Sequence, residues 1–295
     1  MNFNVTFLIV TFKSYSVIHN CLQSIPKGYP ILVVENSSDE NFKKELENSY
    51  KNLECILCYE NLGYGKANNI GLRKAKTKYV FLLNPDTILK SDTLENIQKT
   101  LKKIKNFSLL APIVETNNKG IEFLNYGFFK NETENDFKYV RTFEDFFEVD
   151  FVKGAAMFFN KDEFKDLIFF DENIFFYWED TEICLRLKKN FKHIYVIRAA
   201  KIFHSGGKSH DEDVNHEMEI SKNWHLMWSQ FYLRKKYTGT HNAYLKSFKD
   251  LVKSFLKFFI LYFFNKKKSL YAKARFNGLI AAYHGKNSSF GPKVN

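Results

Sequence analysis

The stretch YVFLLNPDTIL, residues 79–89, joins an apolar run of strand length to an abrupt polar stop at Asn-Pro-Asp. Proline cannot donate a ladder hydrogen bond and disfavours helical backbone in the residue before it, so the strand is expected to end at Asn84. Asp86 should then emerge at the mouth of a buried strand. Turn chemistry alone also explains the sequence, as does capping of a following helix, although Asp92 begins a better capping box.

On both sides of this stretch, apolar runs of strand length alternate with segments of helical spacing. The predicted strands are residues 5–12, 31–36, 53–59 and 79–83. The predicted helices are residues 16–25, 41–50 and 64–75. This alternation predicts βαβ units and a parallel sheet covered on both faces. Ligands bind outside the carboxyl ends of such strands, so polar residues from four strand ends should converge on one rim.

A second group of candidate residues lies downstream. FVKGAAMFF, residues 151–159, is predicted as a strand in which the small residue Gly154 allows close approach to the backbone. Residues 169–189 then place Glu179 and Asp180 among aromatic residues before a predicted helix. Acids at a helix start are stabilised by the helix dipole, and aromatic surroundings also tune a carboxylate for general-base work. Capping and catalysis therefore both remain open for these two residues.

The next apolar run ends at His204. A single histidine is more often structural than a ligand, but Asp86 and His204 together offer the oxygen and imidazole that a divalent cation accepts. His210 and His216 lie in a polar, acidic stretch and are expected to be exposed. Residues 115–150 are polar and turn-rich, and they either shape a substrate site or form a mobile surface segment.

Seven segments resemble, in order, the motifs of the family 2 glycosyltransferases with the GT-A fold. They are LIVTFKS, ILVVENSS, NLGYGKANNIGL, LLNPD, GAAMFF, FFDENIFFYWEDTEICLRL and HSGGKS. The resemblance is to the rhamnosyltransferase-like branch, which builds cell-surface polysaccharides. It implies an α/β, Rossmann-like, mostly parallel sheet flanked by helices over residues 1–215. The nucleotide-binding half would cover about 1–113 and the acceptor and catalytic half about 114–215, with a helical amphipathic extension at 216–295.

The resemblance also implies a reaction and its residues. An inverting enzyme would move a sugar, with L-rhamnose as one candidate, from a dTDP or UDP donor to a hydroxyl of a glycan or lipid-linked glycan. Asp180 would be the general base, with Glu179 beside it near the acceptor. Asp86 and His204 would hold Mg²⁺ or Mn²⁺ on the diphosphate. The donor-binding residues would be Thr11, Phe12, Glu35, Gly63, Asn69, Asn84, Asp86 and Gly154.

This sequence departs from the family pattern at two of these positions. Glu35 stands where the family usually has Asp, and Asn84 stands where a D-x-D motif has its first Asp. Metal coordination would therefore rest on fewer carboxylates.

The charge of the chain is concentrated near its C-terminal end. From Arg234 onward there are 14 basic residues and one acid, which gives a net charge of +13. The first 233 residues carry a net charge of −2, so the total of +11 comes from the C-terminal segment. Within residues 242–268, Lys246, Lys249, Lys253 and Lys257 form one polar stripe of a predicted helix whose remaining surface is mostly apolar. This pattern is typical of a helix lying in the interface of an anionic membrane. Docking on the protein's own body, or a contact between copies, is the alternative.

Other classes fit the sequence less well. The tail aromatics lie on an apolar face and are not interleaved with basic residues, so no nucleic-acid partner is expected. A nucleotidyltransferase should carry a glycine-rich loop after the first strand, and TFKSYS has no glycine. A glycosidase would leave the nucleotide-type rim unexplained. A nucleotidyltransferase and a nucleotide-sugar-binding protein without transferase activity stay as alternatives.

The expected location is the cytoplasm, with peripheral attachment to the inner face of the plasma membrane. No apolar run approaches the roughly 20 residues of a membrane-spanning helix. Residues 1–12 show neither a basic n-region nor a small-residue cleavage site.

Overall fold

The computed structural model describes residues 3–116, 120–122, 145–165, 167–206, 209–292 and 294. Most of the turn-rich segment 115–150, whose role the sequence leaves open, lies outside the described residues. Among the described residues, no helix combines the length and the apolar character needed to cross a bilayer.

The four predicted strands and three predicted helices of the N-terminal half are present. The strands are β1 (Val5–Thr11), β2 (Ile31–Glu35), β3 (Leu53–Leu57) and β4 (Tyr79–Leu83). The helices are α1 (Ile18–Ser24), α2 (Glu40–Ser49) and α3 (Tyr64–Lys74). The strands pair in parallel, as the βαβ pattern predicts, and their order is β3-β2-β1-β4.

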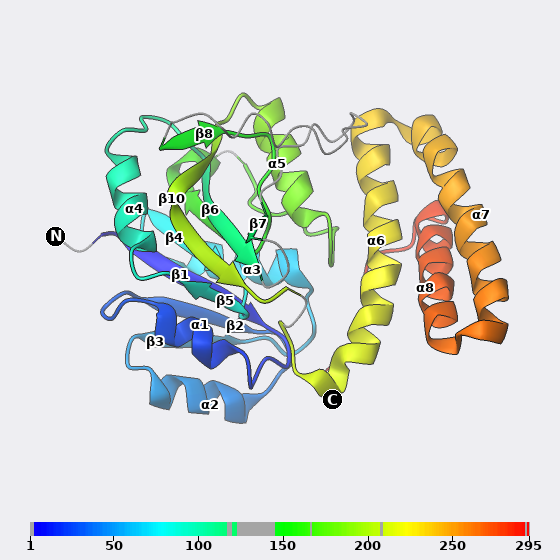
Figure 1. Ribbon diagram of the computed structural model, residues 1–295, viewed down its shortest axis with the longest axis horizontal. Coiled ribbons are helices and arrows are strands. Elements are labelled where there is room, and N and C mark those ends of the chain that lie inside the picture. Colours follow the sequence, from blue (N-terminus) through cyan, green and yellow to red (C-terminus); the bar gives the residue numbers. More distant parts are fainter. Residues whose placement is uncertain are drawn as a thin grey trace.

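The sheet continues beyond β4 with strands from the second half of the chain. These are β5 (Thr87–Leu89), β6 (Leu109–Thr116), β7 (Gly120–Glu122), β8 (Phe146–Glu148), β9 (Ala156–Asn160) and β10 (Ile194–His204). The full order is β3-β2-β1-β4-β9-β6-β10-β5, with β7 paired to β6 and β8 to β10 (Figure 1). Because β9 runs antiparallel to β4, the chain just before β9 lies beside the carboxyl end of β4.

Helices cover both faces of this sheet, which explains why its strands read as continuous apolar runs. One core packs α1, α2 and α4 (Thr93–Leu101) against the sheet, and the other packs α3 and α5 (Glu179–Lys189). The capping box expected at Asp92 does not form, because its carboxylate accepts from the Asn96 side chain and not from the backbone. Helix capping by Asp86 is also excluded, since β5 and not a helix follows it.

Three long helices form a separate layer beside the sheet domain (Figure 1). They are α6 (Asn215–Thr238), α7 (Thr240–Phe264) and α8 (Lys266–Tyr283). Their shared core includes Trp224, Met227, Trp228 and Phe231 of α6 with small residues of α7 and α8. Gly278 of α8 lies so close to α6 that an added Cβ would stand 2.2 Å from the Trp224 carbonyl oxygen.

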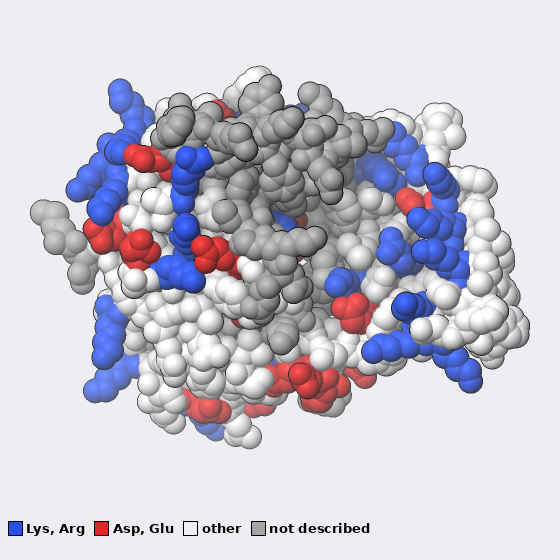
Figure 2. Space-filling view, viewed as in Figure 1, with Lys and Arg blue, Asp and Glu red and all other residues white. Residues whose placement is uncertain are grey.

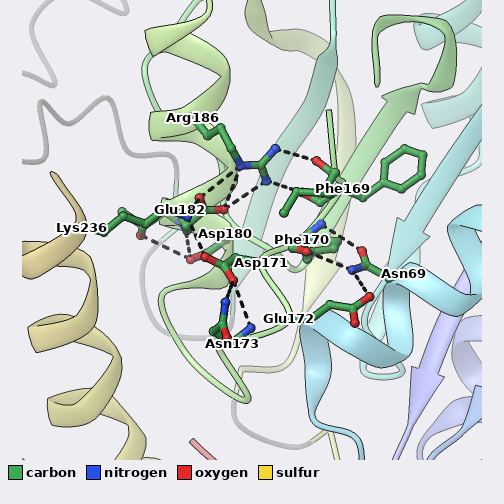
Figure 3. A network of polar contacts seen from close by, with 12 residues as sticks. Asn69, Phe169, Phe170, Asp171, Glu172, Asn173, Asp180, Glu182, Arg186 and Lys236 are labelled. Carbon is green, nitrogen blue, oxygen red and sulfur yellow. Dashed lines mark hydrogen bonds and ion pairs between the residues drawn. The ribbon is translucent and has the colours of Figure 1, made fainter. Parts of the chain in front are cut away.

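A buried polar network fixes α6 to the sheet domain (Figure 3). The Glu182 carboxylate on α5 accepts from the guanidinium of Arg186, and from the Lys236 ammonium of α6 at 2.7 Å. The same ammonium donates to Asp171 at 2.6 Å. A carboxylate buried this completely is costly unless it is paired, so the network holds α6 in one position against the domain.

Candidate active site

The carboxyl ends of the parallel strands line one side of a cavity of about 290 Å³. Eight of the predicted site residues line it: Thr11, Phe12, Gly63, Asn84, Gly154, Glu179, Asp180 and His204. Residues 11–12, 63 and 84 follow β1, β3 and β4, and the others come from the second half of the chain. The fold thus brings together segments that are up to 193 residues apart in the sequence.

Strand pairing explains why His204 lies next to Asp86. β10 pairs antiparallel with β5, and the register sets His204 opposite Thr87. His204 Nε2 is then 3.3 Å from Asp86 Oδ1, which also accepts from the Ser209 hydroxyl at 2.7 Å. Burial alone would raise the pKa of Asp86, but its contacts with His204 and Ser209 outweigh burial and leave that pKa below the ordinary value.

The Asp86–His204 pair has the character of a partial cation site. Asp86 Oδ2 is buried and without a hydrogen-bond partner among the described residues, and the buried His204 Nε2 has the 3.3 Å contact with Asp86 Oδ1 but no well-formed hydrogen bond. Buried polar atoms are rarely left in this state unless a ligand, water or ion completes them. The described residues contain no cluster of three or more potential metal-binding side chains, so these two residues fit a cation only if a substrate or water supplies the remaining oxygens.

Asp180 faces the cavity from the first turn of α5. Its Oδ2 accepts the Gly154 amide at 3.1 Å, and its Oδ1 accepts the Thr181 amide at 2.7 Å. The second bond satisfies one free N–H of the helix start, so capping and a role in the cavity coexist in one side chain. Burial raises the pKa of Asp180, although both amide bonds oppose that shift.

Glu179 differs from its neighbour in protonation. Its Oε2 is buried without a partner among the described residues. Burial, together with the charge of Asp180, raises the pKa of Glu179 to about 8. Burial and the neighbouring charge therefore favour the protonated form of Glu179, whereas the two amide bonds favour the charged form of Asp180.

Tyr64 connects the two halves of the cavity. Its hydroxyl lies 2.9 Å from Asn84 Oδ1 and 2.8 Å from the Gly154 carbonyl oxygen. Burial, with the charges of Glu179, Asp180 and Asp86 nearby, raises the pKa of Tyr64, so the hydroxyl keeps its proton and donates. Sequence reasoning did not single out this residue, although it fills the aromatic position of the N-x-G-[FY] signature.

Three predicted site residues do not line the cavity. Asp86 lies behind the cavity, where it contacts His204 and Ser209, and both of these residues line the cavity. The Glu35 carboxylate is fully buried and accepts from the Thr11 hydroxyl at 2.5 Å and from the Ser37 amide at 2.7 Å, so it braces the rim from within. Asn69 was expected to shape the donor site, but its amide bonds both backbone groups of Phe170.

Gly63 has a clear physical reason to be glycine. Its φ is +76°, and an added Cβ would stand 2.3 Å from the Phe175 carbonyl oxygen. Gly154 is less constrained, because its nearest contacts with Asp180 and Tyr64 would be of ordinary length.

The expected exposure of His210 is wrong. This residue is half-buried and lines the cavity, and burial lowers its pKa. The Ser14 hydroxyl donates to the Ser209 carbonyl at 2.7 Å, which holds the neighbouring backbone against β1. The polarity of the surrounding residues could not predict that this segment folds back onto the end of β1. His216 is exposed, as expected.

The helical extension also contributes to the cavity. Met218 and Ser221 of α6, and Pro292 beyond α8, line it together with Asp180. A boundary near residue 215 therefore passes between residues that share one site.

An α/β sheet with a pocket at the carboxyl ends of its parallel strands defines the class of α/β proteins that bind ligands at that edge. The more specific identification comes from sequence comparison: residues 6–168 match the model "Glycosyl transferase family 2", and the chain belongs to that family. The predicted family is thereby confirmed.

Curated relatives include two transferases. The chain is 24% identical over 203 residues to "Low-salt glycan biosynthesis hexosyltransferase Agl10" of Haloferax volcanii, covering 63% of this chain and 62% of that protein. It is 25% identical over 234 residues to "Rhamnosyltransferase WbbL" of Escherichia coli K12, covering 70% and 82%. The match thus spans about three fifths of the archaeal relative.

Solved structures share the fold. The mannosyltransferase PcManGT of Pyrobaculum calidifontis, in complex with GDP-Man and Mn²⁺, matches with a TM-score of 0.58 at 14% identity over 96% of this chain and 88% of that one. S. aureus TarS 1-349 in complex with UDP matches with a TM-score of 0.55 at 14% identity over 96% and 92%. The predicted GT-A fold with its C-terminal helices is therefore confirmed.

The Tyr64 bridge leads to a stability prediction. Tyr64→Phe removes the hydroxyl and leaves the Gly154 carbonyl without that donor, so the free energy of unfolding should fall by about 1–2 kcal/mol. Tyr59→Phe, on a side chain that is 79% exposed, should change it by less than about 0.5 kcal/mol. Urea denaturation measures both, and equal effects would show that the bridge contributes nothing.

Proposed function

We propose that this protein is an inverting glycosyltransferase that moves a sugar from a nucleoside-diphosphate donor to a hydroxyl of a glycan or lipid-linked glycan. One observation carries the proposal. Asp180 and His204 line one cavity, Asp86 contacts His204 behind it, and the Tyr64 hydroxyl links Asn84 to Gly154, whose amide donates to Asp180.

The side chains suit the two tasks of such a reaction. An acceptor hydroxyl is a poor nucleophile until a positioned base takes its proton, and Asp180 is the ionised, cavity-facing candidate. Glu179, which holds its own proton, is placed to donate a hydrogen bond to the acceptor. Attack on the sugar's C1 opposite the leaving diphosphate inverts that carbon, and no covalent intermediate is required.

Asp86 and His204 are the residues that would hold a divalent cation. When bound, Mg²⁺ or Mn²⁺ supplies positive charge to the departing diphosphate. Two protein ligands are few, so diphosphate oxygens and water would complete the coordination. The Mn²⁺ complexes of PcManGT and of GalNAc-T7, another structural neighbour, support the choice of cation.

The donor is proposed by chemistry and by similarity. Thr11, Phe12, Asn84 and Gly154 line the cavity. We propose that Thr11 and Phe12 contact the nucleotide and that Asn84 and Gly154 lie nearer the sugar. Among relatives and neighbours, the rhamnosyltransferase WbbL and the complexes with UDP and GDP-Man support a nucleotide-sugar. A dTDP or UDP donor is proposed, with L-rhamnose as the first sugar to test. Family membership favours this reading over a nucleotidyltransferase or a binding protein without transferase activity.

Donor binding is tested by thermal shift with UDP, dTDP, GDP and their sugars, with and without Mn²⁺ or Mg²⁺. A ligand at 100 times its Kd stabilises the folded protein by about 2.7 kcal/mol, which is a rise of several degrees. We expect a nucleotide-selective rise that depends on the cation. Asp86→Asn should abolish the cation-dependent part, whereas Asp92→Asn on the exposed start of α4 should retain it. A rise independent of both cation and Asp86 would contradict the assigned cation site.

The roles of the two carboxyl groups are tested by isosteric substitution. Asp180→Asn should lower kcat by about 10²–10⁴-fold and leave nucleotide binding nearly unchanged, because the base acts only on the acceptor. Glu179→Gln should cost less than about tenfold, since the amide imitates the protonated carboxyl that is already present. Nucleoside diphosphate release measures kcat, and thermal shift measures binding. If Glu179→Gln were the more damaging change, the two assignments would have to be exchanged.

The α7 surface supports a membrane partner. Large apolar side chains at helical spacing, Leu245, Phe248, Val252, Phe255, Phe259 and Phe263, are each between 41% and 80% exposed. The exposed lysines 246, 249, 253 and 257 lie along one side of this apolar face, and lysines 266–268 follow at its end. In Figure 2, Lys and Arg gather over the helical layer at the right of the view, with an uncharged strip along the outer edge where α7 lies.

Anionic lipid is the occupant that fits this face. An apolar stripe flanked by lysines matches an interfacial helix, whose side chains enter the acyl boundary while the lysines meet lipid phosphate. A second copy would bring two rows of lysines together. From Arg234 onward the chain has one acidic residue, Asp250, and it lies 3.7 Å from Arg234. We propose that α7 holds the enzyme at an anionic membrane, where a lipid-linked acceptor is available.

Liposome flotation tests this surface. The double variant Phe248→Gln/Phe263→Gln should weaken binding to phosphatidylglycerol-containing vesicles by about tenfold or more, since each ring contributes on the order of 1 kcal/mol when buried. The matched control is Tyr59→Gln/Phe191→Gln on the sheet domain, where both rings are at least 79% exposed. Equal flotation of the two variants would refute the proposal. The proposal would also be refuted if the wild-type protein did not bind vesicles and formed dimers through α7.

A further inference from the structure

Residues 284–292, here called the strap, leave α8 and return to the cavity. The Trp228 indole on α6 donates to the Lys286 carbonyl at 2.9 Å, and the Phe290 ring stacks on Trp224 at 5.4 Å. At the far end, the Asn61 amide donates to the Pro292 carbonyl at 3.1 Å, and Pro292 lines the cavity. The strap therefore runs from the helical bundle to the loop that precedes α3.

His225 on α6 fastens the strap. Its Nε2 contacts the Phe290 carbonyl, and its Nδ1 lies 3.0 Å from the Ser288 hydroxyl. A carbonyl only accepts, so Nε2 carries the proton and Nδ1 accepts from Ser288. Burial lowers the pKa of His225 to about 4, which keeps the ring neutral and fixes this tautomer. The Ser288 oxygen in turn accepts the Phe175 amide at 3.4 Å.

The segment that the strap reaches, residues 175–178, is strained. Tyr177 and Trp178 have φ of 60° and 72°, and two consecutive bulky residues in the left-handed region are strained unless the surrounding structure holds them. Helix α6 holds this backbone. The Trp178 indole donates to the Leu226 carbonyl at 3.1 Å, and the Ser229 hydroxyl donates to the Phe176 carbonyl at 3.1 Å.

The strained segment is connected both to the carboxyl groups of Glu179 and Asp180 and to Tyr64. Glu179 and Asp180 follow it directly, so its backbone sets the direction of the start of α5. Its Phe175 ring stacks on His225 at 4.9 Å, and the Phe175 carbonyl accepts the Tyr64 amide at 2.8 Å. A change at His225 or Ser288 would therefore be transmitted to Tyr64 as well as to Asp180.

We propose that α6 and the strap form a clamp that positions Asp180 by holding the strained segment 175–178. His225 and Ser288 are positioning residues in this clamp, because neither lines the cavity. The inference rests on the proposed function for the role of Asp180. It makes the helical extension part of the catalytic apparatus as well as a membrane-facing layer.

Two variants weaken the clamp without reaching the cavity. His225→Phe keeps a ring for stacking on Phe175 and removes both hydrogen bonds, and Ser288→Ala removes the link between the strap and Phe175. Ser289→Ala is the matched control, because that side chain is exposed and makes no hydrogen bond within the described part of the chain. Hydrogen–deuterium exchange of residues 175–181 and the kinetics of nucleoside diphosphate release are measured for all three.

Both clamp variants should exchange faster at 175–181, with β1–β4 unchanged. Their kcat should fall by about 10- to 100-fold while the Kd for the nucleoside diphosphate changes less than about threefold, as expected when a catalytic group is displaced by a fraction of an ångström. Unchanged exchange at 175–181, or faster exchange with wild-type kcat, would overturn the clamp. If the wild-type protein transfers no sugar, the proposed function fails, and the exchange measurement alone decides whether the clamp exists.

Discussion

The site depends on one buried hydroxyl. Tyr64 lies between Asn84, at the end of the central strand β4, and the backbone of Gly154, whose amide donates to Asp180. The Tyr64 amide, which donates to the Phe175 carbonyl, and the Asn61 amide, which donates to the Pro292 carbonyl, link the same two sides of the cavity outside the sheet. With these contacts, the ionised carboxylate and the cation-type pair keep a fixed spacing, and a reaction in line between donor and acceptor requires such a spacing.

Much of this arrangement could be predicted from the sequence. Apolar runs and short connections are local signals, so the parallel order of β1–β4 and the stop at Asn84 followed from residue types alone. The convergence of Asp86, Gly154, Asp180 and His204 required the motif resemblance, because it depends on β9 pairing antiparallel with β4 and on β10 pairing antiparallel with β5. Pairing between strands that are distant in sequence produces no periodic pattern of residue types. The inward turn of Glu35 and of Asn69, and the partial burial of His210, could not be predicted because each depends on a partner distant in sequence.

The helical extension was the least predictable part. Its charge and its apolar spacing indicated a membrane-facing helix, and α7 does present an exposed apolar face. No pattern in the sequence indicates that α6 holds residues 175–178 or that Pro292 reaches the cavity, because these contacts join segments more than 45 residues apart. The extension therefore has two faces with different tasks. By our two proposals, one face positions the strained turn before Glu179 and Asp180, and the other binds lipid.

The central claim is that the Asp86–His204 pair and Asp180 act on one substrate in the cavity that His204 and Asp180 line. A crystal structure with Mn²⁺ and the nucleoside diphosphate that gives the largest thermal shift tests it most directly. We expect an anomalous peak within about 2.0–2.3 Å of Asp86 and His204, bridging the diphosphate, with Asp180 facing the open side toward the sugar. A nucleotide bound elsewhere, or a manganese ion that contacts neither Asp86 nor His204, would contradict the account.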